Sequence, residues 1–210
     1  MIRHLITAAA CACLVACGGG AGPDPVFVTS GSAQAHRISV LVVGDSTMTP
    51  VYVGERATPD YVADLTGAAV TNLAVSGTTA CQADLAAIRA ARADVVVDNF
   101  AINDSGNSVE VYRECMGRIA AAAREAGSVL VLLQANRIVP GGQWSHARSN
   151  DAIAVMEAEK RAIAIDTGSY YCAQPALPWS LDLVPDGVHP GGKAKPAIAA
   201  TLADCIGRAL

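Results

Sequence analysis

A serine and a histidine far apart in the sequence are the side chains best suited to covalent chemistry. Ser46 ends the segment Gly44-Asp45-Ser46, and His189 follows Asp186 by three residues. Serine is a weak nucleophile at neutral pH and needs a neighbouring base, which the imidazole of a histidine can supply. A carboxylate that accepts a hydrogen bond from the other ring nitrogen orients such a histidine. Ser46, His189 and Asp186 therefore form a candidate catalytic triad.

The attack of a serine on a carbonyl carbon creates an oxyanion, which needs hydrogen-bond donors. Three groups are candidates for this oxyanion hole: the backbone N–H of Ser46, the backbone N–H of Gly77 and the side-chain amide of Asn103. Gly77 has no Cβ, so its backbone can approach a substrate closely. We expect these groups to converge beside Ser46.

Four segments together resemble the SGNH, or GDSL-type, serine hydrolase family. Gly44-Asp45-Ser46 is similar to the family's first block, Gly77 to the second, Asn103-Asp104 to the third, and Asp186 to His189 to the Asp-x-x-His block. The resemblance covers most of the chain from Ile38 onward. It implies hydrolysis of carboxylic esters through an acyl-serine intermediate, without a metal or an organic cofactor.

Two positions depart from the pattern of that family. Thr47 replaces the leucine of the namesake motif, and Ala101 stands where the third block has glycine. The Cβ of Ala101 is expected to lie beside the oxyanion site, where it would narrow or tilt the site.

Short apolar runs alternate with helical patterns in the segment that must position these residues. The runs are rich in β-branched residues and continuous, which is typical of strands buried on both faces. The predicted strands are Ile38–Val43, Ala69–Ala74, Val95–Phe100, Val129–Leu133 and Ala162–Asp166. The predicted helices are Pro59–Thr66, Ala80–Ala91, Ser108–Ala126, Asn150–Lys160 and Lys195–Ala209.

This order predicts an α/β fold with three layers, in which helices cover both faces of a doubly wound, parallel, five-stranded sheet of the flavodoxin-like type. The candidate residues follow the carboxyl ends of strands, where the ligand crevice of such a sheet opens. Trp144, Tyr170, Tyr171 and Trp179 are expected in loops near that crevice, where they could stack on a sugar or cap the core. Tyr52 and Arg137 could line the cleft.

The N-terminal residues have the layout of an export signal. Arg3 precedes an uncharged apolar run from Leu5 to Ala16, and a glycine-rich segment follows. The string Leu14-Val15-Ala16-Cys17 resembles the lipobox of bacterial lipoproteins, which implies acylation of Cys17. An alternative is a plain secretory signal cleaved between Ala16 and Ala21.

Three regions follow from this pattern. Residues 1–16 are the expected lipoprotein signal peptide, residues 17–36 a flexible tether rich in glycine, proline, serine and alanine, and residues 37–210 the hydrolase domain. Two or three acyl chains on Cys17 would hold the protein stably on a membrane. We therefore expect an exported, lipid-anchored protein of the bacterial cell envelope that contacts the membrane only through its anchor.

Four cysteines remain for the domain, and four allow three disulfide connectivities. The helices after the second and third strands are expected side by side, which favours Cys81 with Cys115. Cys172 with Cys205 would then tie the last loop to the last helix. The alternative of four buried free thiols suits an oxidising compartment less well.

The charge and composition of the chain limit the classes of ligand that it is expected to bind. The net charge of −4 and the lack of a basic run argue against nucleic acid. The absence of a Cys-x-x-Cys pair and of a closely spaced histidine pair gives no reason to expect a metal site. We expect a monomer that acts on a small-molecule or polysaccharide ester, with a preference for short acyl or carbohydrate acetyl groups. The alternatives are a non-catalytic binding lipoprotein of the envelope and an acyltransferase on the same fold.

Overall fold

The computed structural model describes residues 36–210. The predicted signal peptide, the acylation of Cys17 and all of the tether except His36 lie outside the described residues. Within the described part of the chain, no helix combines the length and the apolar character that a membrane crossing requires.

Five parallel strands form one sheet with the order β2-β1-β3-β4-β5. This order confirms the predicted doubly wound arrangement, because the chain starts at an inner strand, moves to the edge strand β2 and then returns past β1 to build the other side. The strands are β1 (Ser39–Val43), β2 (Ala69–Asn72), β3 (Val95–Asp98), β4 (Val129–Leu133) and β5 (Tyr170–Cys172).

The valines of β3 show why the apolar runs are continuous. Val95 and Val97 face one hydrophobic cluster, whereas Val96 faces the other. Successive side chains of a strand point to opposite faces of the sheet, and here each face is covered by helices. A central strand of this sheet therefore has no polar face.

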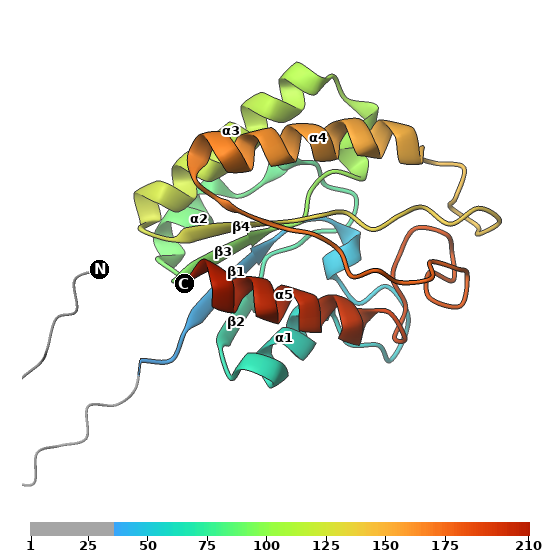
Figure 1. Cartoon of the computed structure of the whole chain (residues 1–210), viewed down its shortest axis with the longest axis horizontal. Coiled ribbons are helices and arrows are strands. Elements are labelled where there is room, and N and C mark those ends of the chain that lie inside the picture. Colours follow the sequence, from blue (N-terminus) through green and yellow to red (C-terminus); the bar gives the residue numbers. More distant parts are fainter. Residues whose placement is uncertain (1–35) are drawn as a thin grey trace, which may run out of the picture. The chain divides into compact units, whose positions relative to one another are not determined.

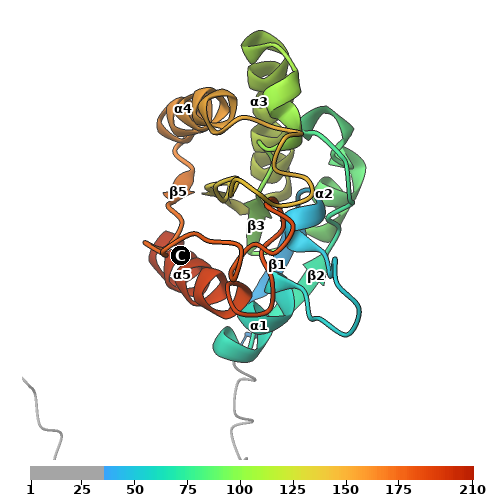
Figure 2. The same cartoon turned by 90° about the vertical axis from the view of Figure 1, so that its right-hand side faces the viewer.

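Helices cover the two faces unequally (Figures 1 and 2). Helices α1 and α5 pack on one face, where Val62 and Ile198 join the cluster around Val97. Helices α2, α3 and α4 cover the other face with residues such as Met116 and Met156. The bounds are α1 (Thr58–Thr66), α2 (Leu85–Ala91), α3 (Val109–Ala126), α4 (Asn150–Thr167) and α5 (Lys195–Ala209).

The fifth strand was predicted in the wrong place. Residues Ala162–Asp166 continue helix α4, and the strand is the shorter segment Tyr170–Cys172. Ile163 is buried against the core while Ile165 is exposed, so the β-branched residues of this run follow a helix period. The helix ends at Gly168, which adopts the left-handed conformation with φ of 68°.

The predicted helix Ala80–Ala91 is two elements. A short 3-10 helix covers Ala80–Gln82, and α2 begins after Asp84, whose side chain caps it by accepting a hydrogen bond from the N–H of Ala87. The edge strand β2 is also shorter than predicted and largely exposed. An edge strand pairs on one side only, which leaves its residues more open to solvent.

Both predicted disulfides are present. Cys81 bonds to Cys115 and joins the short 3-10 helix to α3, and Cys172 bonds to Cys205. Cys172 lies in β5 rather than in a loop, so the second disulfide joins the edge strand to α5.

Candidate active site

The structure brings the three candidate triad residues together although they lie up to 143 residues apart in the sequence. The hydroxyl oxygen of Ser46 is 2.8 Å from Nε2 of His189. Nδ1 of His189 is 2.7 Å from Oδ2 of Asp186. With a neutral imidazole protonated on Nδ1, the Ser46 hydroxyl donates to Nε2 and the ring donates to the carboxylate. This is the geometry that an activated serine requires.

The turn after β1 holds Ser46 at the carboxyl edge of the sheet. Oδ1 of Asp45 accepts hydrogen bonds from the backbone N–H of Thr47 at 2.9 Å and from its hydroxyl at 2.8 Å. The same hydroxyl contacts the side-chain amide of Asn99, which follows β3. Thr47 therefore links the serine turn to the neighbouring strand, a role that a leucine could not perform. Burial raises the pKa of Asp45, against the effect of these hydrogen bonds.

A tight turn orients His189. Oδ1 of Asp186 accepts hydrogen bonds from the backbone N–H groups of Val188 and His189 at 2.9 and 2.8 Å. Burial alone would raise the pKa of Asp186, but these hydrogen bonds and the imidazole outweigh it, so the pKa lies below its usual range. Gly187 has φ of +88°, and a Cβ there would lie 2.7 Å from the carbonyl oxygen of Val139. Only glycine fits this position.

The three expected oxyanion donors line one pocket with Ser46 and His189. Gly77 has φ of +80°, which favours glycine, and open space surrounds the position of a Cβ. Asn103 donates one side-chain N–H to the carbonyl of Thr78 at 3.0 Å, which leaves its second N–H for a ligand. Among the described residues, no acceptor receives the backbone N–H of Ser46 or Gly77. The arrangement can therefore offer three hydrogen bonds to an oxyanion.

Ala101 does not line this pocket, contrary to expectation. It is fully buried, and its side chain belongs to the core cluster that also contains residues of α3.

The pocket has a volume of about 470 Å³, and Trp144 and Arg148 are among the residues that line it. Trp144 is 48% exposed, and Arg148 is half-buried. Both belong to the loop between β4 and α4, where the sequence motifs gave no reason to single out Arg148. Arg148 lies in a polar loop at no fixed distance in the sequence from a catalytic motif, so the sequence alone does not identify it as a site residue.

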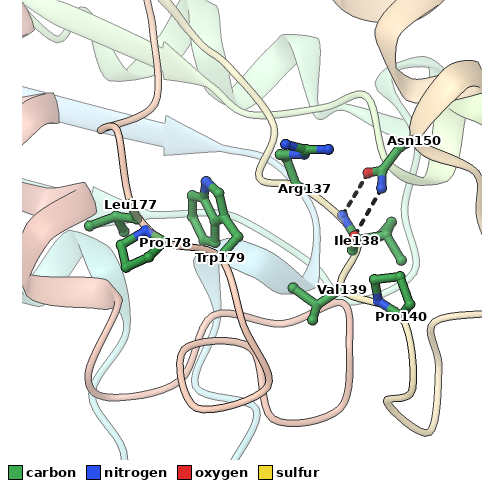
Figure 3. Close-up of a pocket in the computed structure, with 8 residues that line it drawn as sticks. All are labelled: Arg137, Ile138, Val139, Pro140, Asn150, Leu177, Pro178 and Trp179. Atoms are coloured by element: carbon green, nitrogen blue, oxygen red, sulfur yellow. Dashed lines mark hydrogen bonds between the residues drawn. The ribbon is translucent and has the colours of Figure 1, made fainter.

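A second pocket of about 480 Å³ is formed by the segment after β4 and the segment after β5. Figure 3 shows Trp179 and Arg137 on its walls. Arg137, which was expected as a residue that could line the cleft, lines this second pocket and not the pocket of Ser46. Tyr52 does not line either pocket, although its hydroxyl lies 3.5 Å from the carbonyl oxygen of His189.

The two tyrosines expected near the crevice lie elsewhere. Tyr170 and Tyr171 belong to β5 at the far edge of the sheet. The hydroxyl of Tyr171 donates to Oε2 of Glu157 at 2.9 Å. Both tyrosines pack against the core rather than line the pocket. They were expected in a loop because the fifth strand was predicted too early in the chain.

A buried group of charged side chains lies beside the sheet and was not predicted from the sequence. Lys160 is fully buried, donates to the carbonyl of Leu133 at 2.8 Å, and lies 3.2 Å from Glu157 and 3.8 Å from Asp98. Glu157 also accepts the backbone N–H of Ala135 at 2.9 Å. Lys160 lies on the buried side of α4. Because lysine is rarely buried, its place in the sequence did not predict this.

Two buried carboxyls near these charges have raised pKa values. Burial raises the pKa of Asp98 to about 7, although the Lys160 cation opposes it. Burial likewise raises the pKa of Asp104 to about 6, against the hydrogen bond that its Oδ1 accepts from the N–H of Ala80 at 2.9 Å. Asp104 thereby holds the short 3-10 helix that follows the Gly77 loop.

Residues 42–195 match the GDSL-like lipase/acylhydrolase family. The chain belongs to this family. The matched region of this GDSL-like hydrolase includes the serine turn, the Gly77 and Asn103 loops and the Asp186–His189 turn. Among curated proteins, no sequence matches the chain. Within the described residues of the hydrolase, no group of three or more histidine, cysteine or acidic side chains is placed to hold a metal ion.

Solved structures share the fold of this GDSL-like hydrolase. A protein from Agrobacterium tumefaciens that is assigned as an arylesterase has 25% identity and a TM-score of 0.66, and the match covers 82% of this chain and 100% of that chain. A variant of the acetylxylan esterase from Geobacillus stearothermophilus has 18% identity and a TM-score of 0.64, with 81% and 94% covered. The psychrotrophic esterase EstA from Pseudoalteromonas sp. has 19% identity and a TM-score of 0.63, with 81% and 97% covered.

Proposed function

We propose that this hydrolase cleaves carboxylic esters through an acyl-serine intermediate. The observation that carries the proposal is the unbroken series of contacts from Asp186 through His189 to Ser46, with 2.7 and 2.8 Å between the paired atoms. The series ends in a pocket that also presents the unpaired N–H groups of Ser46 and Gly77. A nucleophile, a base and oxyanion donors thus meet at one point.

The residues divide the reaction into two steps. His189 takes the proton of the Ser46 hydroxyl on Nε2 as Oγ attacks the carbonyl carbon, and the oxyanion is held by the N–H groups. His189 then gives this proton to the departing alkoxide, which leaves as the alcohol. Water attacks the acyl-serine and gives a proton to Nε2, and His189 then returns this proton to Oγ of Ser46 as the carboxylic acid leaves. Asp186 stabilises the imidazolium in both steps.

Short acyl groups and acetylated carbohydrates are the proposed substrates. The exposed indole of Trp144 offers a flat surface on which a sugar or an aromatic ring can pack. Two structural neighbours have names that support this proposal. The protein from Agrobacterium tumefaciens is assigned as an arylesterase, and the protein from Geobacillus stearothermophilus is an acetylxylan esterase.

A series of para-nitrophenyl esters from acetate to palmitate tests the proposal. We expect the purified domain to hydrolyse the short members best and the Ser46→Ala variant to lose turnover while keeping its unfolding midpoint. Ser169→Ala, near the opposite edge of the sheet, is the matched control and should retain activity. Full activity of Ser46→Ala would overturn the mechanism, and a well-folded domain without activity on any member would overturn the ester hydrolase proposal.

We further propose that the chain is exported and anchored in the bacterial envelope by lipid on Cys17. The support is the lipobox-like string before Cys17 together with the two disulfides, which are typical of an oxidising compartment. Expression in a bacterium that processes lipoproteins tests it. We expect Cys17→Ser to move the protein from the membrane fraction to the soluble fraction, whereas Cys13→Ser should not. Equal fractionation of Cys17→Ser and the unchanged chain would overturn the anchor.

A further inference from the structure

Arg148 is the one arginine or lysine that lines the Ser46 pocket, within the part of the chain that the structure describes. Backbone carbonyls hold its guanidinium in place. Nε donates to the carbonyl of Ile102 at 3.2 Å, and Nη1 donates to the carbonyl of Ala147 at 2.6 Å. A guanidinium has five N–H donors, so the remaining N–H groups, including both on Nη2, are free to bind a ligand.

No acidic side chain neutralises this cation. Four other arginines of the domain, Arg56, Arg89, Arg113 and Arg208, form salt bridges at 2.5 to 2.9 Å. Arg148 has no such partner among residues 36–210. The carboxylate of the triad, Asp186, already accepts three hydrogen bonds, from the backbone N–H groups of Val188 and His189 and from the ring of His189.

The position of Arg148 relative to Ser46 is set by the loop that carries Trp144. The backbone N–H of Trp144 donates to the carbonyl of Asp186 at 2.8 Å, and the N–H of Ala147 donates to the carbonyl of Trp144 at 2.9 Å. This loop is therefore tied directly to the triad turn. An indole and a guanidinium therefore line the pocket from a loop that is hydrogen-bonded to the triad turn.

We infer that Arg148 binds a carboxylate on the substrate, so that the pocket selects short or ring-containing esters whose acyl group or leaving group carries a negative charge. A guanidinium fork matches the two oxygens of a carboxylate, and such charged hydrogen bonds are stronger than neutral ones. The ring of the substrate packs on Trp144. This inference rests on the proposed ester hydrolysis, and it adds the charge and shape of the substrate to it.

Matched pairs of esters test the inference. One pair places the charge on the leaving group: para-acetoxybenzoate and the neutral para-acetoxybenzamide. The other places it on the acyl group: mono-para-nitrophenyl glutarate and para-nitrophenyl valerate. Each kcat/KM is divided by the rate constant of hydroxide hydrolysis of the same ester. We expect the anionic member of at least one pair to be preferred by about tenfold or more, because that is the effect of one charged hydrogen bond.

Three variants and the salt concentration separate the outcomes. Arg148→Gln should abolish the preference mainly through KM for the anionic ester, and Arg148→Lys should restore part of it. Arg137→Gln removes the same charge from the neighbouring pocket and should change nothing (Figure 3). The preference of the unchanged enzyme should also fall as salt rises.

Failure of this inference differs from failure of the proposed function. Hydrolysis of the neutral esters without a preference for the anionic ones would overturn the role of Arg148 and leave ester hydrolysis standing. An equal loss on all four esters in Arg148→Gln would show that the side chain only supports the loop at Ile102. Absence of hydrolysis of every ester by the unchanged enzyme would overturn the proposed function, and the inference with it.

Discussion

Asn136 and Val188 join the end of β4 to the turn that carries the candidate catalytic histidine. Nδ2 of Asn136 donates to the carbonyl oxygen of Val188 at 2.8 Å, and Asn136 is buried. Val188 precedes His189 directly, so this hydrogen bond connects the rigid sheet to the imidazole. The sheet thereby supports a residue that belongs to a long loop.

Replacing this asparagine is expected to impair activity and stability together. Asn136→Ala leaves the buried carbonyl of Val188 without its donor, which costs about 1–3 kcal/mol. The turn is then less well held, and kcat should fall while KM changes little. Urea unfolding and ester kinetics measure the two effects. The control is Asn107→Ala at an exposed position, and equal kinetics of Asn136→Ala and the unchanged enzyme would refute the positioning role.

Gly187 and Gly168 form a matched pair for the effect of a side chain in the left-handed conformation. Their φ angles are +88° and +68°, but a Cβ at Gly187 meets the carbonyl of Val139 at 2.7 Å whereas one at Gly168 meets nothing within 4 Å. Gly168→Ala should cost about 1 kcal/mol, the strain of the conformation. Gly187→Ala should cost more and should also displace His189 and lower kcat. Thermal unfolding measures the difference, and equal losses would show that the turn yields freely.

The two disulfides allow stability and activity to be separated. They span 34 and 33 residues, so loop entropy predicts nearly equal losses of about 2–4 kcal/mol when either is removed. Only Cys81–Cys115 adjoins the short 3-10 helix that follows the Gly77 loop. The double variant Cys81→Ala/Cys115→Ala should therefore lose more kcat than Cys172→Ala/Cys205→Ala at a temperature where both are folded. A larger kinetic loss from the second pair would contradict this assignment.

Asp98 is expected to make folding depend on pH. Because burial raises its pKa in the folded state to about 7, the folded protein binds more protons than the unfolded chain between about pH 4 and pH 7. The contribution of this group is thus fully present below the unfolded pKa and is lost as the pH rises through the folded pKa. Urea unfolding of the unchanged protein and of Asp98→Asn across this range measures it.

The difference between the two proteins isolates this carboxyl, since the effects of Asp186 and other groups cancel. The variant should gain stability relative to the unchanged protein as the pH rises from about 4 to about 7. Asp166→Asn at an exposed site is the control and should show no such trend. A constant difference across the range would mean that Asp98 is ionised in the folded state throughout.

Local patterns in the sequence were enough to predict the first four strands of the sheet and the residues that meet at its carboxyl edge. Continuous valine-rich runs indicate strands covered on both faces, and in a parallel sheet the segments that follow such strands lie at one edge. Ser46, Gly77, Asn103 and His189 could therefore be grouped before their distances were known. The pair Cys81–Cys115 followed from the same topology, because it places their elements next to one another, and Cys172–Cys205 was then the pair that remained.

Tertiary packing decided what the local patterns left ambiguous. The run Ala162–Asp166 suits a strand or a helix, and the burial of Ile163 with the exposure of Ile165 selects the helix. The burial of Lys160 between Asp98 and Glu157 depends on three segments meeting, as does the separation of Arg148 from Arg137 into different pockets. Periodicity is a property of one segment, whereas the partner of a buried charge or the wall of a pocket is a property of several segments folded together.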